Sequence, residues 1–240
     1  MKNTFSLILF CLFTTVLFAQ KTVNDANAEV RKVGSFTALS VSNAFDVIIT
    51  QGTEEGLAVS ASDKEDVQYI KTEVSGGTLK IWFDHKDKKF WSKNRKLRAY
   101  VSVKKLEELK ASGACDIKIE GGLSATNFKL ILSGASDLDG KLNISGSLDI
   151  HASGASDIDI TGSANEITID ANGASDVTAI DFTANSCKKI EGSGASSISI
   201  SVTNDIAEAK LSGASSLVYK GNPSVKNIKT SGASSISRRS

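Results

Sequence analysis

The chain has 240 residues, with one proline, 19 glycines, 28 basic and 27 acidic side chains. Without Lys2, which lies in the N-terminal segment described next, 27 basic residues balance 27 acidic ones. A zero net charge gives no support to nucleic acid or an anionic membrane as the partner.

The first 19 residues have the pattern of a secretory signal peptide. Lys2 precedes an apolar run from Leu7 to Phe18, and Ala19 offers a small residue before Gln20. The run is too short for a membrane-spanning helix, and no later stretch is long and apolar enough to span a bilayer. We therefore predict an exported protein, located in the periplasm, outside the cell or on its outer surface.

Residues 34–110 form a less regular region. Five runs in it have the composition of strands: FTALSV, FDVIIT, LAVSA, TLKIWF and LRAYVSV. Asn43 and Gly113, which occupy corresponding positions in the repeat described below, are 70 residues apart. This region is therefore expected to form longer, irregular N-terminal coils or a sheet that caps the rest.

A basic, aromatic loop lies in this region, with the sequence FDHKDKKFWSKNRK from Phe83 to Lys96. Trp and Arg are favoured at recognition hot spots, and loops carry function on rigid scaffolds. The candidate ligand-binding residues are Trp82, Phe90, Trp91, Lys89, Lys93 and Arg95. The alternative is a hairpin whose tryptophans pack onto the sheet while its lysines lie in solvent.

From residue 111 to residue 240 the chain repeats a short word seven times, as S-G-A-S-D, S-G-A-S-S or the close variants SGACD at Ser112 and NGASD at Asn172. Its glycines are Gly113, Gly134, Gly154, Gly173, Gly194, Gly213 and Gly232. Their separations are 21, 20, 19, 21, 19 and 19 residues. A fixed period near 20 residues is typical of a solenoid, in which no repeat can bury its apolar face alone.

Aligning the repeats on these glycines reveals two apolar columns. Four residues before each glycine stand Leu109, Leu130, Ile150, Ile169, Ile190, Ala209 and Ile228. Four residues after it stand Ile117, Leu138, Ile158, Val177, Ile198, Leu217 and Ile236. Around both columns apolar and polar residues alternate with period two, which indicates strands. We predict an all-β protein, a parallel β-solenoid with about 20 residues per coil, at least two strands flanking each word and a third in the variable part.

The repeated word is interpreted as a structural corner. Glycine tolerates left-handed backbone angles, alanine fits a crowded bend, and Ser or Asp side chains can satisfy turn amides. A degenerate copy, SNAFDVII, has Asn43 where the glycine stands. Asn is the residue other than glycine that most often adopts left-handed angles, so this exchange suits a corner.

The outward positions next to the corner are predicted to pair with each other. Opposite charges fall on neighbouring coils, as at Lys129 and Asp149 or Glu191 and Lys210. The two cysteines beyond the signal segment, Cys115 and Cys187, lie in the first and fourth repeats. Coils stacked at ~4.8 Å would hold them roughly 14 Å apart, so no disulfide is expected.

An acidic column follows the corner and offers a possible cation site. Its residues are Asp116, Asp137, Asp157 and Asp176, with Asp139 and Asp159 two positions further on. Ca²⁺ prefers several carboxylate and carbonyl oxygens, so a calcium-binding solenoid is one alternative. In the other, each aspartate accepts hydrogen bonds from amides of its own turn, which fits the serines that replace it in the later coils.

A polysaccharide-active enzyme is a further alternative, because β-helix lyases and hydrolases use clustered acidic residues. Against it, no arginine occurs between Arg98 and Arg238, and the repeats contain only three aromatic rings. Ser and Asp are so common here that a Ser-His-Asp set around His151 needs no functional explanation. We therefore predict no enzyme activity, no catalytic residues and no cofactor.

The chain resembles a known family in several of these features. Asn43-Ala-Phe-Asp-Val-Ile-Ile, Gln51-Gly52, the TLKIWF strand, the basic Trp-containing loop and the S-G-A-S-D repeats are similar to the head GIN-domain family of auto-transporter adhesins. The resemblance covers the chain from about Phe36 to its end. It implies one domain over residues 34–240, a single-stranded right-handed β-helix and an adhesin or surface-binding role. The expected partner is a glycan or a protein of a host or cell surface.

Overall fold

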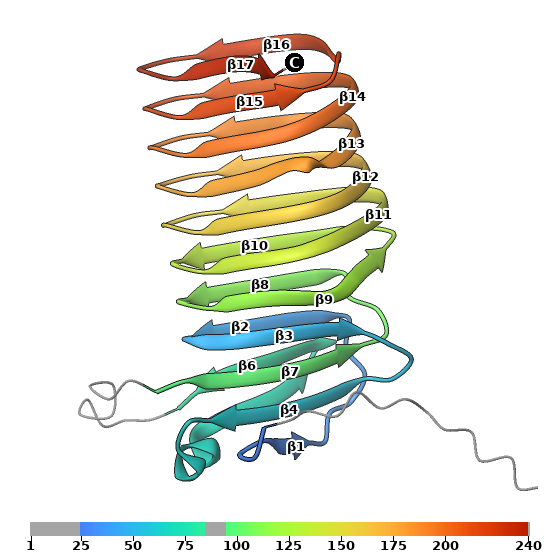
Figure 1. Ribbon diagram of the computed structural model, residues 1–240, viewed down its shortest axis with the longest axis vertical. Coiled ribbons are helices and arrows are strands. Elements are labelled where there is room, and N and C mark those ends of the chain that lie inside the picture. The colour runs from blue at the N-terminus through green and yellow to red at the C-terminus, as the bar shows by residue number, and fades with distance from the viewer. Residues whose placement is uncertain (1–24, 85–94, 240) are drawn as a thin grey trace, which may run out of the picture.

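The computed structural model describes residues 25–84 and 95–239, so the predicted signal peptide lies outside the described residues. It is a β-solenoid of about 7 turns with roughly 20 residues per coil, which confirms the predicted fold class. Each coil runs along one face, turns at a sharp edge and returns along the other face (Figure 1). The opposite edge, where the variable parts lie, is rounded.

The regular coils stack in chain order, from green to red in Figure 1. Their strands are β8 (Glu108–Gly113), β9 (Asp116–Ala125), β10 (Phe128–Gly134), β11 (Asp137–Ala152), β12 (Asp157–Ala171), β13 (Asp176–Gly192), β14 (Ser197–Leu211), β15 (Ser216–Lys220), β16 (Ser224–Thr230) and β17 (Ser235–Arg239). From β11 to β14 one strand runs from each corner to the next, so the variable part is not a separate third strand. It bends through register shifts, such as the one between Ile144 and Ser147, which curve a strand without ending its ladder.

The parallel register places like positions of successive coils side by side. Leu130 opposes Leu109 on one side and Ile150 on the other, and all three are fully buried. The second apolar column behaves in the same way: Leu138 pairs with Ile117 and with Ile158. Both predicted columns therefore form the continuous core between the two faces as far as Ala209 and Leu217, whereas their last members, Ile228 and Ile236, are less covered.

The N-terminal region forms a cap at the lower end of the stack. Its elements are β1 (Glu29–Arg31), β2 (Ala38–Asn43), β3 (Phe45–Gln51), β4 (Gly56–Ala61), the 3₁₀ helix η1 (Lys64–Tyr69), β5 (Ile70–Ser75), β6 (Thr78–Phe83) and β7 (Leu97–Val103). The five strand-like runs correspond to β2, β3, β4, β6 and β7. The first coil, β2 and β3, lies between β6 and β7 on one side and β8 and β9 on the other. The β1–β4, β4–β7 and β5–β6 pairs are antiparallel, so the cap combines an inserted coil with antiparallel strands.

A single carboxylate ties the start of the described chain to this cap. Asp25 Oδ2 accepts hydrogen bonds from Ser60 Oγ at 2.7 Å, Tyr100 Oη at 2.9 Å and Arg98 Nη1 at 3.3 Å. Its Oδ1 accepts the backbone N–H of Asn27 at 3.1 Å. The Ser60 hydrogen bond is the main reason why the pKa of Asp25 lies below its usual value; burial opposes it. The cap is therefore held by a charged hydrogen-bond network, in addition to its apolar contacts.

The two described cysteines are free and buried, in agreement with the sequence. Burial raises the pKa of the Cys187 thiol to about 12, so it is protonated at neutral pH and packs as a small apolar group. Among residues 25–84 and 95–239, no helix is long and apolar enough to cross a membrane.

Candidate binding surface

The repeated word forms the sharp edge of the solenoid. Gly154 has φ 86°, and a Cβ atom placed on it would lie 2.3 Å from the carbonyl oxygen of Gly134. The backbone N–H of Ala155 donates to that same oxygen at 2.7 Å. The other six glycines also have positive φ and lie equally close to the coil before them. The close contact between the backbones of successive corners therefore requires a residue with no side chain at this position.

Asn43 occupies the same column but lies at the lower end of the stack. Its φ is 83°, and among the described residues it is the one residue other than glycine with a positive φ. Gly113 stacks on it, whereas the strand on its other side ends at Phe83. The Asn43 Oδ1 atom accepts the backbone N–H of Phe83 at 2.9 Å. Within the described residues, the Asn43 side chain caps the end of the neighbouring strand β6.

The second serine of the word is buried, which the sequence did not reveal. Ser156 Oγ donates to the carbonyl oxygen of Ser153 at 3.0 Å, and Ser175 Oγ donates to that of Asn172 at 2.9 Å. Cys115 takes this position in the first repeat. The hydroxyls of Ser156 and Ser175 therefore lie inside the corner and hold its shape, and they are not available to a ligand.

The predicted aspartate column lies on the face that follows the corner. Asp116, Asp137, Asp157 and Asp176 stack on consecutive coils, and Asp46 of β3 extends the column downward. All five are exposed. Burial, followed by the charges of Asp157 and Asp116, raises the pKa of Asp137, although the backbone N–H of Asp157 partly offsets this. The column carries like charges side by side, and at its lower end Arg98 Nε lies 3.8 Å from an Asp46 oxygen.

The stacked carboxylates form a line and do not converge on a point. Asp139 pairs in register with Asp159 on one side and with Lys118 on the other. In the part of the chain that the structure describes, no three His, Cys, Asp or Glu side chains form a group that could hold a metal ion. The geometry thus gives no support to the proposed calcium site.

Only two of the six predicted ligand-binding residues belong to the described part of the chain. Trp82 is half-buried on β6, where it pairs across the strands with Lys71. Arg95 Nε donates to the buried Asp66 Oδ2 at 2.5 Å, and both side chains are largely buried. This contact gives Arg95 a structural role in the cap. The other four, Phe90, Trp91, Lys89 and Lys93, lie outside the described residues.

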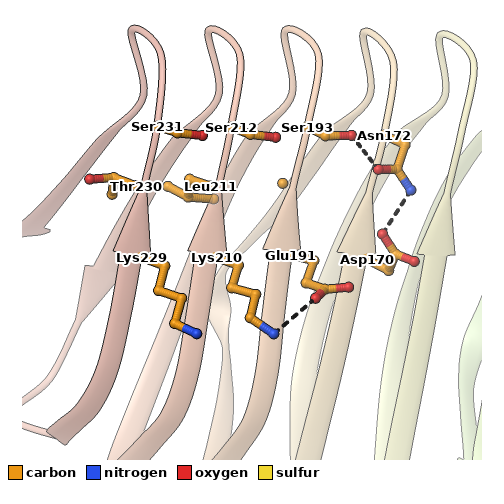
Figure 2. A pocket seen from close by; sticks show the side chains of 11 residues that line it. Asp170, Asn172, Glu191, Ser193, Lys210, Leu211, Ser212, Lys229, Thr230 and Ser231 are labelled. Carbon is orange, nitrogen blue, oxygen red and sulfur yellow. Dashed lines mark hydrogen bonds and ion pairs between the residues drawn. The ribbon is translucent and has the colours of Figure 1, made fainter.

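A shallow pocket of about 370 Å³ lies beside the sharp edge, over β12, β13, β14 and β16 (Figure 2). We call it the edge pocket. Its lining consists of Asp170, Asn172, Glu191, Gly192, Ser193, Lys210, Leu211, Ser212, Lys229, Thr230 and Ser231. Corresponding residues of four successive coils therefore contribute to one surface.

Polar side chains of the edge pocket are fixed by hydrogen bonds along the stack. Asn172 Nδ2 donates to Asp170 Oδ1 at 2.7 Å, and Ser193 Oγ donates to Asn172 Oδ1. Lys210 Nζ lies 3.7 Å from a Glu191 oxygen, which confirms the predicted pairing of these two residues. Figure 2 shows the acidic residues toward one end of the pocket and the lysines toward the other. The pocket can therefore bind a polar ligand through hydroxyl, amide, carboxylate and ammonium groups.

Sequence reasoning identified the outer column of this pocket but not the depression. The column two residues before the corner glycine holds Ala171, then Gly192, then Leu211. A Cβ atom on Gly192 would lie 2.7 Å from Leu211 Cδ2, so the leucine takes the space that this glycine leaves. This column faces inward, because Ala171 and Leu211 are buried, so it gave no signal for a depression on the outer surface.

These observations define a parallel β-solenoid whose exposed columns form an extended polar surface. The chain belongs to the family described as "Putative auto-transporter adhesin, head GIN domain", whose sequence profile matches residues 35–223. A search of curated proteins finds no match.

Several solved structures share the fold. A putative adhesin from Bacteroides fragilis has a TM-score of 0.77 at 23% identity, over 88% of this chain and 96% of its own. A putative lipid binding protein from Parabacteroides distasonis has a TM-score of 0.64 at 21% identity, over 90% of this chain and 98% of its own. A putative adhesin from Parabacteroides merdae has a TM-score of 0.62 at 16% identity, over 89% and 95% of the two chains.

Proposed function

We propose that the protein is exported and non-enzymatic, and that it binds a glycan or a surface protein through its outer columns. The edge pocket is the observation that carries this proposal. Its polar groups come from coils in fixed register, and Asp170, Asn172 and Ser193 are linked to each other, so these three are positioned before a ligand arrives. A preorganised polar surface loses little side-chain entropy on binding.

Membership of an adhesin family supports binding as the role. The geometry around His151 also favours binding over catalysis. Its Nδ1 atom lies 3.7 Å from an Asp170 oxygen, and 43% of the His151 side chain is exposed. That arrangement is a solvent-exposed contact in the outer column, and the distance is longer than a hydrogen bond.

One solved structure with this fold is named a putative lipid binding protein. In this chain the space between the two faces is filled by the buried columns, with Phe128, Phe182 and Leu123 among the largest buried side chains. A lipid chain would have to bind outside this core. The edge pocket, with its polar lining, suits a sugar or a polar protein surface better.

The experiment is a screen of residues 20–240 against arrays of glycans and extracellular-matrix proteins. Mass spectrometry of each bound ligand then shows whether the protein has left it chemically unchanged. A pocket variant, Asp170→Asn with Ser193→Ala, should weaken the ligand found by at least tenfold. The matched control, Asp181→Asn with Thr183→Ala, removes an exposed carboxylate and hydroxyl elsewhere on β13 and should leave affinity unchanged. Equal affinity of both variants would remove the pocket from the proposal, and conversion of the ligand would make the protein an enzyme.

A further inference from the structure

The coil formed by β16 and β17, which we call the terminal coil, pairs on one side only. β16 pairs with β14, and β17 pairs with β15. In the described chain neither strand has a second neighbour, whereas each strand from β9 to β13 is paired on both sides. The outward backbone N–H and C=O groups of the terminal coil are therefore available to another strand.

The terminal coil also exposes side chains of the apolar columns. Ile228 stacks on Ala209, which is 1% exposed, yet Ile228 itself is 53% exposed. Val225, which stacks on the buried Ile206, is only partly covered. Covering such residues with an apolar partner surface is favourable, because it removes them from water.

The charge of this end is one-sided. Residues 209–240 contain no acidic residue, and their basic residues are Lys210, Lys220, Lys226, Lys229, Arg238 and Arg239. Lys229 stacks directly on Lys210, and Arg239 stacks on Lys220. Like charges directly opposite each other are destabilising.

Acidic side chains offset only part of this charge. Lys226 Nζ lies 2.8 Å from an Asp205 oxygen, and Lys210 Nζ lies 2.8 Å from a Glu208 oxygen. Within the described residues, neither Lys229 nor Arg239 forms an ion pair. The terminal coil therefore combines open strand edges, an uncovered apolar column and unneutralised cations.

We propose that the terminal coil binds an extended, acidic segment of a partner protein, which adds a strand beside β16. A strand satisfies the open backbone groups, which a lipid surface cannot do. The cations disfavour a second copy of the same coil, since that would bring like charges together. Acidic side chains on the added strand would pair with Lys229, and its apolar side chains would cover Val225 and Ile228.

The chain itself supplies a probe with this chemistry, the sequence of β12, DIDITGSANEITIDA. Placed in the register of the stack, this peptide would set Ile167 over Val225, Ile169 over Ile228 and Asp170 over Lys229. It is used blocked at both ends and fluorescently labelled, and its binding to residues 20–240 is followed by anisotropy. Two control peptides replace its acids by amides or replace Ile167 by proline, which cannot join a ladder.

We expect binding of the acidic peptide, with affinity at least tenfold weaker for both control peptides. A Lys229→Glu protein should also bind at least tenfold more weakly, and its new carboxylate can pair with Lys210, so folding is preserved. A Lys105→Glu protein, changed at an exposed site of the first coils, should bind like the parent. The Asp170→Asn, Ser193→Ala pocket variant should do so too, which separates this proposal from the function proposed above.

Three results would overturn the proposal. Equal binding of the proline peptide would show charge attraction without strand addition. A dimer in sedimentation velocity that Lys229→Glu dissolves would show that a second copy covers the terminal coil. Vesicles of phosphatidylglycerol that bind the parent but not Lys229→Glu, with no binding of the peptide, would identify a lipid surface instead.

Discussion

The regular coils and the N-terminal cap both stack strands on one another, but they differ in which strands pair and in what direction. In the coils, each strand from β10 onward lies on the coil that precedes it in the chain, and a left-handed glycine at the corner permits the close approach. In the cap, strands distant in the chain are brought together, and β1, β4 and β5 run antiparallel to their partners.

The difference teaches where the stability of each region resides. A regular coil depends on one steric condition at its corner, repeated on every turn, and on apolar columns. The cap depends on individual polar contacts, such as those of Asp25 and the pair of Asp66 with Arg95. Substitutions in the two regions should therefore destabilise the fold for different physical reasons.

The largest effect is expected at a corner glycine. Gly154→Val forces a β-branched residue into left-handed angles and drives its Cβ atom toward Gly134 O, so we expect a loss of more than about 3 kcal/mol. The measurement is the free energy of unfolding from urea titrations. Gly34→Val in the cap is the control, since a Cβ atom there meets nothing within 4 Å. Equal losses in the two variants would mean that the corner contact is not the cause.

The next largest effect is expected in the cap. Asp25→Asn removes the charge that Ser60, Tyr100 and Arg98 bond, which should cost about 2 kcal/mol at pH 7. Asp46→Asn is the control, because Asp46 lies 3.8 Å from Arg98 Nε but is 52% exposed. Thermal and urea unfolding of both variants check the prediction, and an Asp46 variant as unstable as the Asp25 variant would contradict it.

Acidification should distinguish the parent from Asp25→Asn. The pKa of Asp25 is lowered from 3.8 in the folded protein, so the folded state binds fewer protons at this site than the unfolded state. Its stabilisation is present above the unfolded pKa and is lost as pH falls through the folded pKa. The gap in stability between parent and variant should therefore shrink below pH 3.8. A constant gap would assign the effect to shape instead of charge.

A smaller effect, of opposite sign, is expected in the aspartate column. The folded pKa of Asp137 is raised above 3.8, so stability is lost as pH rises from 3.8 through that higher value. Asp137→Asn with Asp157→Asn should therefore stabilise the fold at pH 7, by about 0.5 kcal/mol. Asp181→Asn is the control, and a destabilised double variant would show that the carboxylates hold the turn.

The same double variant tests the calcium and enzyme alternatives. Calorimetric titration of the parent with Ca²⁺ should show no tight site, and the parent should release no product from polysaccharides. A sub-micromolar site that the double variant loses would establish calcium binding. Turnover that it loses would establish catalysis by the column.

The smallest effect is expected at His151. Its ring is exposed and lies 3.7 Å from an Asp170 oxygen, so His151→Ala should change stability by less than about 0.5 kcal/mol. Urea unfolding beside Gly154→Val, three residues away, is the measurement. A larger loss at His151 than at Gly154 would invalidate the assignment of inward and outward columns.

Sequence reasoning reached the coils because their determinants are local and repeated. Leu130 and Ile150 share a position relative to the corner glycine, so the register follows from alignment alone. The strand pairing of the cap could not be predicted in this way, because Leu39 pairs with both Leu79 and Leu109, which are 40 and 70 residues away in the sequence. Ionic contacts such as Arg95 with Asp66 were missed for the same reason. The edge pocket depends on how side chains of four successive coils are arranged at the surface, which a search for motifs does not compare.

The insertion of the first coil between later strands has a consequence for the order of folding. β2 is made early, but one of its neighbours, β6, begins at Thr78, and the other, β8, begins at Glu108. Because β2 and β3 pair with β8 and β9 at a separation of 70 residues, this coil cannot be completed during synthesis until about 70 further residues have followed, and closing such long loops slows folding. Each later coil, by contrast, needs only the coil made about 20 residues before it. Folding should thus begin slowly, with assembly of the cap, and then proceed rapidly as each new turn adds to a template already in place.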